Sequence, residues 1–229
     1  YEYIGLIYGV PLFRHALSAC DFGIASTATL ARLMEKHVRN ARCLVLPNGL
    51  DETNAAVIQI GAASVEVTRN PIYIFYGSGT KAHNSDFTTL VGLALLDVMR
   101  LHPEVRLVIV GHLNLIPEFE AYSDRIVRLG FISDIQHYWS VLAAADINIA
   151  PLDRRVSTDC KSEIKWLEAA VLQVPSIVSR TKTYEEVIED GVDGLLASDT
   201  DEWRTALERL ITDRPLRRRL GAAARAAFG

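Results

Sequence analysis

One carboxylate, Glu168, stands at an unusual place in the sequence. In a helix predicted over residues 164–172, successive side chains point about 100° apart. Glu168 then falls on the same arc as apolar side chains such as Leu167. A buried carboxylate without a partner is costly. Glu168 therefore either pairs with Lys165 or Lys161, lies exposed at the edge of the apolar stripe, or faces a cleft and accepts hydrogen bonds from sugar hydroxyls.

A candidate anion site directly precedes this helix. Residues 158–162 (TDCKS) lead into it after a predicted strand that ends at Ala150. The free N–H groups and the dipole of a helix N-terminus favour an anion, and Lys161 adds a positive charge. From spacing alone, plain capping by Ser162 is the simpler interpretation. Phosphate binding gains weight because Glu168 lies two turns further on.

A glycine-rich turn, residues 77–82 (GSGTKA), follows the first strand of the alternating pattern. It formally fits the dinucleotide fingerprint G-x-G-x-x-A. However, the next helix is predicted to begin near Ser85, and the second strand ends at 110–112 (VGH) without an acidic residue to hold an NAD ribose. An NAD-dependent oxidoreductase is thus a weak alternative to a turn that lets a phosphate approach the backbone. The candidate phosphate contacts are Gly77, Gly79, Thr80 and Lys81.

Other kinds of site are not signalled. The sequence contains no G-x-x-x-x-G-K-[ST] loop and no G-x-S-x-G elbow, and its six histidines lack ligand spacing, so no metal site is predicted. The three cysteines, Cys20, Cys43 and Cys160, are odd in number and far apart. They form neither a disulfide framework nor a CxxC site, which favours a reducing, cytoplasmic compartment.

Composition excludes two further classes of protein. The 229 residues carry 24 basic and 28 acidic side chains, a net charge of −4. A chain without a basic excess is a poor candidate for nucleic-acid binding. No apolar run approaches the roughly 20 residues that a transmembrane helix needs.

Strand and helix patterns alternate after residue 71, which predicts an α/β fold with a doubly wound, mostly parallel sheet. The predicted strands are 72–76, 105–110, 125–129, 146–150, 175–179 and 194–197. The predicted helices are 87–101 (capped by Ser85 or Asp86), 115–121, 134–144, 162–172, 184–190, 201–212 and 215–227. Ligands of such sheets bind beyond the carboxyl ends of the strands.

The first part of the chain differs. Residues 1–50 alternate helix and strand (helices 12–20 and 28–38, strands 22–25 and 43–46) but are too few for a domain, and the turn signal at 47–49 (PNG) marks a boundary. We therefore predict the C-terminal remnant of another domain over 1–50, a linker over 51–70 and a Rossmann-like domain over 71–229. Because the chain begins at Tyr1 without a signal peptide, we expect a piece of a longer protein.

Several ordered segments resemble group 1 glycosyltransferases with the GT-B fold. Residues 167–179 (LEAAVLQVPSIVS) are similar to the family's LEAxAxGxPVVxS stretch, and 185–196 (EEVIEDGVDGLL) to its E-x-V-x-D-G-x-x-G-L-L continuation. Further matching segments are 47–51 (PNGLD), 146–151 (DINIAP) and the closing helices over 210–225. Residues 160–168 (CKSEIKWLE) resemble a branch that builds bacterial surface polysaccharides.

The resemblance implies a donor-binding domain that takes a nucleotide-sugar and transfers the sugar to an acceptor hydroxyl, with no metal or other cofactor. It places the ribose hydroxyls on Glu168. It places the diphosphate near Lys81, Lys161 and the N–H groups by Ser162, with the two lysines as catalytic residues. The backbone near Gly130 and Phe131 would contact the base.

The sequence departs from the family at three points. Cys160 stands where a second glutamate is common, and Gln173 stands where a glycine usually ends the helix. The arginine that commonly precedes the phosphate lysine has no clear counterpart.

These features predict a glycosyltransferase donor domain that acts in bacterial surface glycan synthesis. Its expected partners are a nucleotide-sugar, a glycan or lipid-linked acceptor and an N-terminal domain. The expected location is cytoplasmic, with the inner face of the membrane as a peripheral site. The alternative is a non-catalytic nucleotide-sugar or glycan-binding domain, which the cysteine at position 160 makes reasonable.

Overall fold

The computed structural model describes residues 2–49, 71–79 and 84–227 (side chains from residue 9). The chain divides into two compact units. The first comprises Tyr1–Gly49 and Arg155–Glu163, and the second comprises Leu50–Arg154 and Ile164–Gly229. The predicted linker over 51–70 lies outside the described residues, and the predicted domain boundaries stay a prediction.

The first unit is a small parallel α/β piece. Its elements are α1 (Glu2–Ala19), β1 (Gly23–Ala25), α2 (Ala28–Met34), β2 (Cys43–Val45) and the short helix α7 (Val156–Asp159). β1 and β2 pair in parallel. The Thr27 hydroxyl caps α2 by accepting from the Leu30 N–H at 3.2 Å, and it donates to the Cys160 carbonyl at 3.2 Å. That second bond ties residues 155–163 to this unit.

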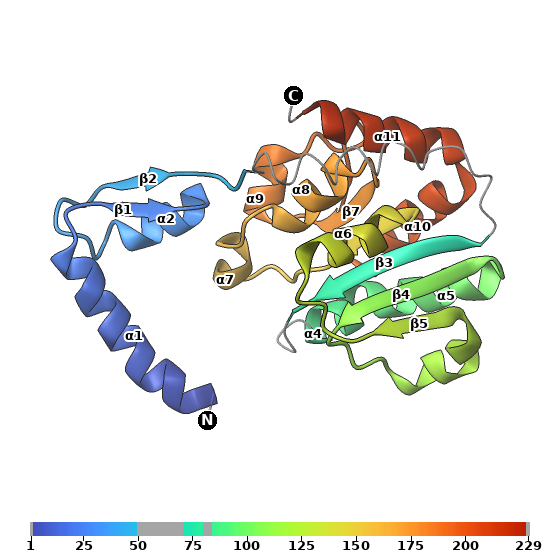
Figure 1. Cartoon of the computed structure of the whole chain (residues 1–229), viewed down its shortest axis with the longest axis horizontal. Helices are drawn as coiled ribbons and strands as arrows, with labels where there is room; N and C mark the ends of the chain where they lie inside the picture. Colours follow the sequence, from blue (N-terminus) through green and yellow to red (C-terminus); the bar gives the residue numbers. More distant parts are fainter. Residues whose placement is uncertain (1, 50–70, 80–83, 228–229) are drawn as a thin grey trace. The chain divides into compact units, whose positions relative to one another are not determined.

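The second unit is built on a six-stranded, entirely parallel sheet in the order β5-β4-β3-β6-β7-β8. Figure 1 shows β3, β4 and β5 running side by side. The strands are β3 (Ile72–Ser78), β4 (Val105–Gly111), β5 (Ile126–Leu129), β6 (Ile147–Ala150), β7 (Ser176–Ser179) and β8 (Leu195–Ala197). The predicted doubly wound α/β fold is confirmed, and the direction of strand succession reverses between β3 and β6.

Helices cover both faces of this sheet, which explains why its strands are nearly continuous apolar runs. The helical elements are α4 (Asn84–Asp86), η2 (Phe87–Gly92), α5 (Leu93–Leu101), η3 (Pro117–Arg125), α6 (Ile135–Ala143), α8 (Ile164–Val171), α9 (Lys182–Val187), α10 (Thr200–Thr212) and α11 (Arg214–Ala226). Side chains of α5 and α10 pack with Ile74 and Leu107 in one core. Side chains of α6 and α8 pack with Phe75 and Val108 in a second core.

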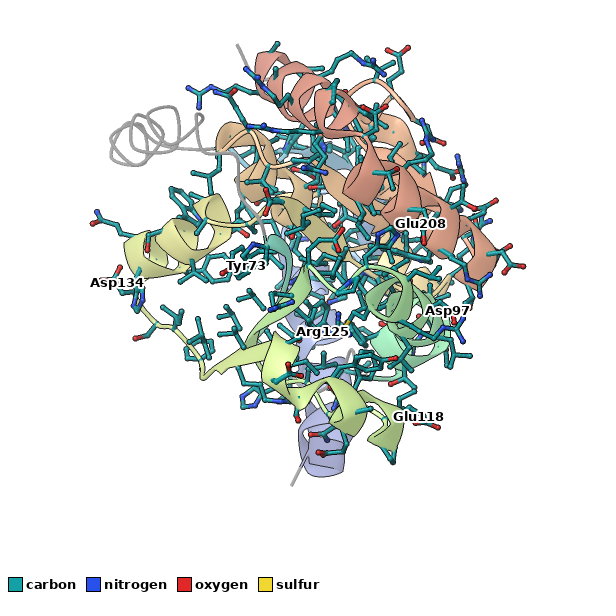
Figure 2. All side chains as sticks on the ribbon, turned by 90° about the vertical axis from the view of Figure 1, so that its right-hand side faces the viewer. Tyr73, Asp97, Glu118, Arg125, Asp134 and Glu208 are labelled. Carbon is teal, nitrogen blue, oxygen red and sulfur yellow. The ribbon has the colours of Figure 1, made fainter. Side chains whose placement is uncertain are left out.

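Polar contacts between neighbouring helices accompany this packing. Arg204 on α10 pairs with Asp97 on α5 at 2.9 Å, and Glu208 on α10 contacts His102 at the end of α5 at 2.8 Å. Figure 2 labels Asp97 and Glu208 on these two helices. No helix among the described residues combines the length and apolar composition that a membrane span requires.

The predicted cap of the first helix of this unit is wrong. Ser85 and Asp86 are already helical, within α4, and the chain continues through the π-helical turns of η2 into α5. Asp86 is buried rather than placed at a solvent-exposed helix start. The helix therefore begins nearer to the glycine-rich turn than residue types alone indicate.

The end of α8 is unusual, because Gln173 adopts a left-handed conformation with φ of 57°. Its N–H donates to the Ala170 carbonyl at 3.0 Å, and the next N–H, of Val174, donates to the Ala169 carbonyl at 2.9 Å. This is a Schellman ending, which normally carries glycine. The expectation that the helix ends without a left-handed residue is therefore wrong.

Helix α11 supports this strained turn. A side chain at Gly221 would place its Cβ 2.0 Å from the Gln173 carbonyl oxygen, so glycine lets α11 approach the turn. Arg225 of α11 donates to the Val171 carbonyl, one of the unpaired carbonyls at the end of α8.

Two substitutions test this arrangement. Gln173→Gly removes a left-handed side chain that costs about 1–2 kcal/mol, partly offset by the entropy of glycine, so the free energy of unfolding is expected to rise by up to about 1 kcal/mol. Gly221→Ala is expected to lower it by about 2 kcal/mol through steric overlap. Denaturant unfolding measures both values, and an unchanged Gly221→Ala variant would contradict the close approach.

Candidate functional site

A pocket of about 230 Å³ opens at the carboxyl ends of β3 and β4, beside the reversal point of the sheet. Ligands of open parallel sheets bind at this position. The pocket takes its walls from the ends of β3 and β4, the loop before α6, and the first turns of α6 and α8. Its lining residues are Gly77, Ser78, Gly79, Val110, Gly111, Phe131, Ile132, Ser133, Ile135, Tyr138, Ile164, Lys165 and Glu168.

Helix α8 presents one polar edge to the pocket. Lys165 and Glu168, three residues apart and so on one face of the helix, line the pocket, whereas Trp166 and Leu167 are buried. The buried Asn148 on β6 donates to the Lys165 carbonyl at 3.2 Å and thereby fixes the first turn of α8 on the sheet. Glu168 is half-buried, at the edge of the apolar stripe rather than in its middle.

Two neighbouring aromatic side chains of α6 hold the Glu168 carboxylate. The Trp139 indole N–H donates to Glu168 Oε1 at 3.3 Å, and the Tyr138 hydroxyl is a second hydrogen-bond partner. Burial raises the pKa of Glu168 above its ordinary value, while the bond from Trp139, the charge of Lys165 and the bond from Tyr138 act in the opposite direction. The carboxylate is thus fixed in place while it lines an open pocket.

Helix α6 is itself firmly anchored at its start. The Asp134 carboxylate caps it by accepting from the N–H groups of Gln136 at 2.8 Å and His137 at 3.3 Å. Figure 2 labels Asp134 where α6 begins. The cap orients the following turn, from which Tyr138 and Trp139 reach α8.

Gly77 makes room for one of these aromatic side chains. A Cβ at position 77 would lie 2.6 Å from the Tyr138 hydroxyl and 3.1 Å from the Phe75 ring. The rings of Tyr138 and Phe75 meet edge to face at 5.7 Å. Gly77 was expected to serve phosphate approach, and the structure adds that it admits the hydroxyl that contacts Glu168.

Lys165 places its ammonium group at the end of β3. Its Nζ donates to the Gly77 carbonyl and lies 5.9 Å from the centre of the Tyr76 ring. Burial raises the pKa of Tyr76 to about 12, so this ring is neutral at ordinary pH. Lys165 is the basic residue among the described residues that line the pocket.

The predicted site residues are distributed unevenly. Gly77, Gly79, Phe131 and Glu168 line the pocket together, whereas Gly130, next to Phe131, is not among the lining residues that the structure describes. Lys161 and Ser162 belong to the first unit, and α8 begins at Ile164 rather than Ser162. Thr80 and Lys81 lie outside the described residues. The assignment of these residues to donor binding stays a prediction.

Three lining residues were missed from the sequence. Gly111 has a positive φ of 89°, and a Cβ there would lie 2.0 Å from the Ser78 carbonyl oxygen. Its signal was a glycine directly after a predicted strand. Tyr138 gave no signal, because a tyrosine on a helix next to a tryptophan is most simply a packing residue. Lys165 was considered only as an ion-pair partner of Glu168.

A larger pocket, of about 380 Å³, lies within the first unit between α1 and α2. Its lining is almost entirely apolar, with Phe13, Leu17 and Met34 among its residues. A ligand site needs polar groups that converge on the ligand, and the smaller pocket at the sheet has them. Within the described parts of both units, no three His, Cys, Asp or Glu side chains gather as a metal site would require.

Comparison with known families bears directly on this pocket. The model of the family described as glycosyl transferases group 1 matches residues 71–213, more than half of the chain. This chain belongs to the group 1 glycosyltransferases. The resemblance noted from the sequence motifs is confirmed, and the matched segment contains every residue that lines the pocket.

Solved structures share the fold at low sequence identity. Staphylococcus aureus TarM, in complex with fondaparinux, α-GlcNAc-glycerol and UDP, matches with a TM-score of 0.70 at 12% identity over 93% of this chain and 41% of its own. Anabaena HepE in complex with UDP-glucose matches with a TM-score of 0.61 at 19% identity over 90% and 58%. WaaG, a glycosyltransferase involved in lipopolysaccharide biosynthesis, matches with a TM-score of 0.63 at 18% identity over 90% and 57%.

The chain thus spans between 41% and 58% of the length of these three glycosyltransferase structures. No curated protein matches the sequence. Within the family, the NAD-dependent oxidoreductase that the glycine-rich turn left open is not favoured.

The raised pKa of Glu168 predicts a pH-dependent stability. Below its ordinary value of 4.5 the carboxyl is protonated in the folded and unfolded states alike. Above 4.5 the folded state holds its proton more tightly, so this group lowers stability as the pH rises toward its folded pKa. Glu168→Gln mimics the protonated form. Its free energy of unfolding relative to the native chain is expected to be more favourable at pH 7 than at pH 4.

Denaturant unfolding at the two pH values measures this difference. Glu186→Gln, a change of an exposed glutamate on α9, is the matched control. If the two variants shift equally with pH, the Glu168 carboxyl is not in the environment described.

Proposed function

We propose that this chain forms the donor-binding part of a glycosyltransferase, which transfers a sugar from a nucleotide-sugar to an acceptor hydroxyl in bacterial surface glycan synthesis. The observation that carries the proposal is the position of Glu168. Its carboxylate lines an open pocket at the carboxyl ends of β3 and β4, in a chain of the group 1 glycosyltransferase family. The sheet ends and the polar edge of α8 support a nucleotide there.

The Glu168 carboxylate suits a vicinal diol such as that of ribose. An ionised carboxylate accepts at about four lone-pair positions, and the bonds from Trp139 and Tyr138 use two of them. Two positions remain on a group that the protein already holds in orientation. Ribose hydroxyls would form charge-assisted hydrogen bonds there, and the fixed side chain would lose little entropy on binding.

The ligands of two structural relatives support the same donor class. TarM was solved with UDP and α-GlcNAc-glycerol, and HepE with UDP-glucose. WaaG acts in lipopolysaccharide biosynthesis. By analogy, we propose a nucleotide-sugar donor and a glycan or lipid-linked acceptor for this chain, together with an N-terminal acceptor domain in the whole enzyme. The proposed location is cytoplasmic, including the inner face of the membrane.

The proposed reaction exchanges one bond at the anomeric carbon. The bond between that carbon and the diphosphate oxygen breaks, and its electron pair stays on the departing nucleoside diphosphate. The acceptor oxygen bonds to the anomeric carbon on the same face, in a retaining transfer, and its proton passes to the departing diphosphate. Lys81 and Lys161 are the proposed catalytic residues, because positive groups stabilise the charge that develops on the leaving group.

The test of this proposal is calorimetric titration with UDP-, GDP- and TDP-sugars. Glu168→Ala is expected to weaken binding of the preferred donor by about 10- to 100-fold, because hydrogen bonds to a charged group contribute about 1.5–3 kcal/mol. The fold should persist, since Glu168 lies at a pocket edge.

Glu186→Ala, at an exposed position of α9, is the matched control and should bind as the native chain does. Equal donor affinity in the native chain and the Glu168→Ala variant would refute the role of this carboxylate. Failure of the native chain to bind any of the three donor classes would refute the proposed function itself.

A further inference from the structure

Lys165 is the described pocket residue that no part of the proposed reaction uses. Its side chain leaves α8 on the same face as Glu168 and extends to the end of β3, where Nζ contacts the Gly77 carbonyl. The side chain is half-buried, so its charge acts in an environment less polar than water. A lysine in this position raises the local concentration of positive charge at the mouth of the glycine-rich turn.

The backbone beneath Lys165 is fixed in two directions. The buried Asn148 amide donates to its carbonyl at 3.2 Å and also to the Ser176 hydroxyl at 3.0 Å, which links α8 to β6 and β7. The ring of Tyr76, 5.9 Å from Nζ, bounds the path of the side chain. The ammonium is therefore held at one place in the pocket rather than free to sample solvent.

The spacing of Lys165 and Glu168 matches a ligand with two chemically different parts. Side chains three residues apart on a helix start about 5–6 Å from each other. The carboxylate would accept from hydroxyl groups, and the ammonium would donate to an anion near them. An ammonium carries three donors and can contact a carbonyl and a ligand oxygen together. A nucleoside diphosphate carries hydroxyls on its ribose and negative charge on the adjoining phosphates.

We infer that Lys165 binds the diphosphate of the nucleotide, at the end of β3 beside Gly77. This inference rests on the proposed function and adds to it a phosphate-binding residue that comes from α8. It differs from the assignments of Lys81 and Lys161, which rest on the family resemblance. The positive end of α8, whose first residue Ile164 also lines the pocket, acts in the same direction.

The experiment compares nucleoside diphosphates with the corresponding nucleosides. UDP, GDP and TDP are titrated into the native chain by calorimetry, and uridine, guanosine and thymidine binding is followed by ligand-observed NMR. Lys165→Met keeps the length of the side chain and removes the charge. It is expected to weaken binding of the preferred diphosphate by about tenfold or more, with nucleoside binding within about twofold of native.

Two further variants sharpen the result. Lys165→Arg keeps the positive charge and should retain most of the diphosphate affinity. Lys182→Met removes an exposed lysine of α9 and should leave both affinities unchanged. Thermal unfolding of each variant, without ligand, separates a loss of binding from a loss of folding.

The outcomes distinguish the two levels of the account. If the native chain binds a diphosphate and Lys165→Met binds it equally well, the role of Lys165 is overturned while the proposed function stands. If Lys165→Met loses diphosphate and nucleoside binding alike, the lysine only supports the pocket, and the inference is again overturned. If the native chain binds none of the three diphosphates, both the inference and the proposed function fail.

Discussion

A carboxylate on the packed side of a helix must be solvated by something, and in this chain that requirement organises the site around Glu168. Burial disfavours its charge, and the protein answers with an indole N–H, a phenol and a nearby ammonium. Those donors come from α6 and from α8 itself, so the two helices are tied together at the pocket wall. The bonds from Trp139 and Tyr138 also fix the direction of the carboxylate. A group held in this way is pre-organised to accept hydroxyl donors from a ligand.

The position of Glu168 also depends on contacts far from the pocket. The first turn of α8 is fastened to β6 by Asn148. Its last turn closes through the left-handed Gln173, against which α11 can pack only because position 221 is glycine. A shift of α8 along its axis would move the carboxylate relative to the ends of β3 and β4. Packing at the C-terminal helix and ligand geometry at the sheet are therefore parts of one mechanical arrangement.

The sequence predicted the architecture well, because alternating apolar strands and amphipathic helices leave few arrangements other than a parallel doubly wound sheet. It also singled out Glu168, since a charge beside Leu167 breaks the local pattern. The partners of that charge were beyond reach, because Tyr138 and Trp139 lie about thirty residues earlier and contact it only through the packing of α6 on α8. The left-handed Gln173 was equally hidden, because tertiary contacts there override a local preference for glycine.

A crystal structure of the chain with the nucleoside diphosphate that it binds most tightly would test the central claim most directly. The account predicts that the ribose hydroxyls lie within hydrogen-bond distance of the Glu168 carboxylate, with the bonds to Trp139 and Tyr138 still in place. A nucleotide bound elsewhere would contradict it. So would a Glu168 side chain turned away from a nucleotide in this pocket.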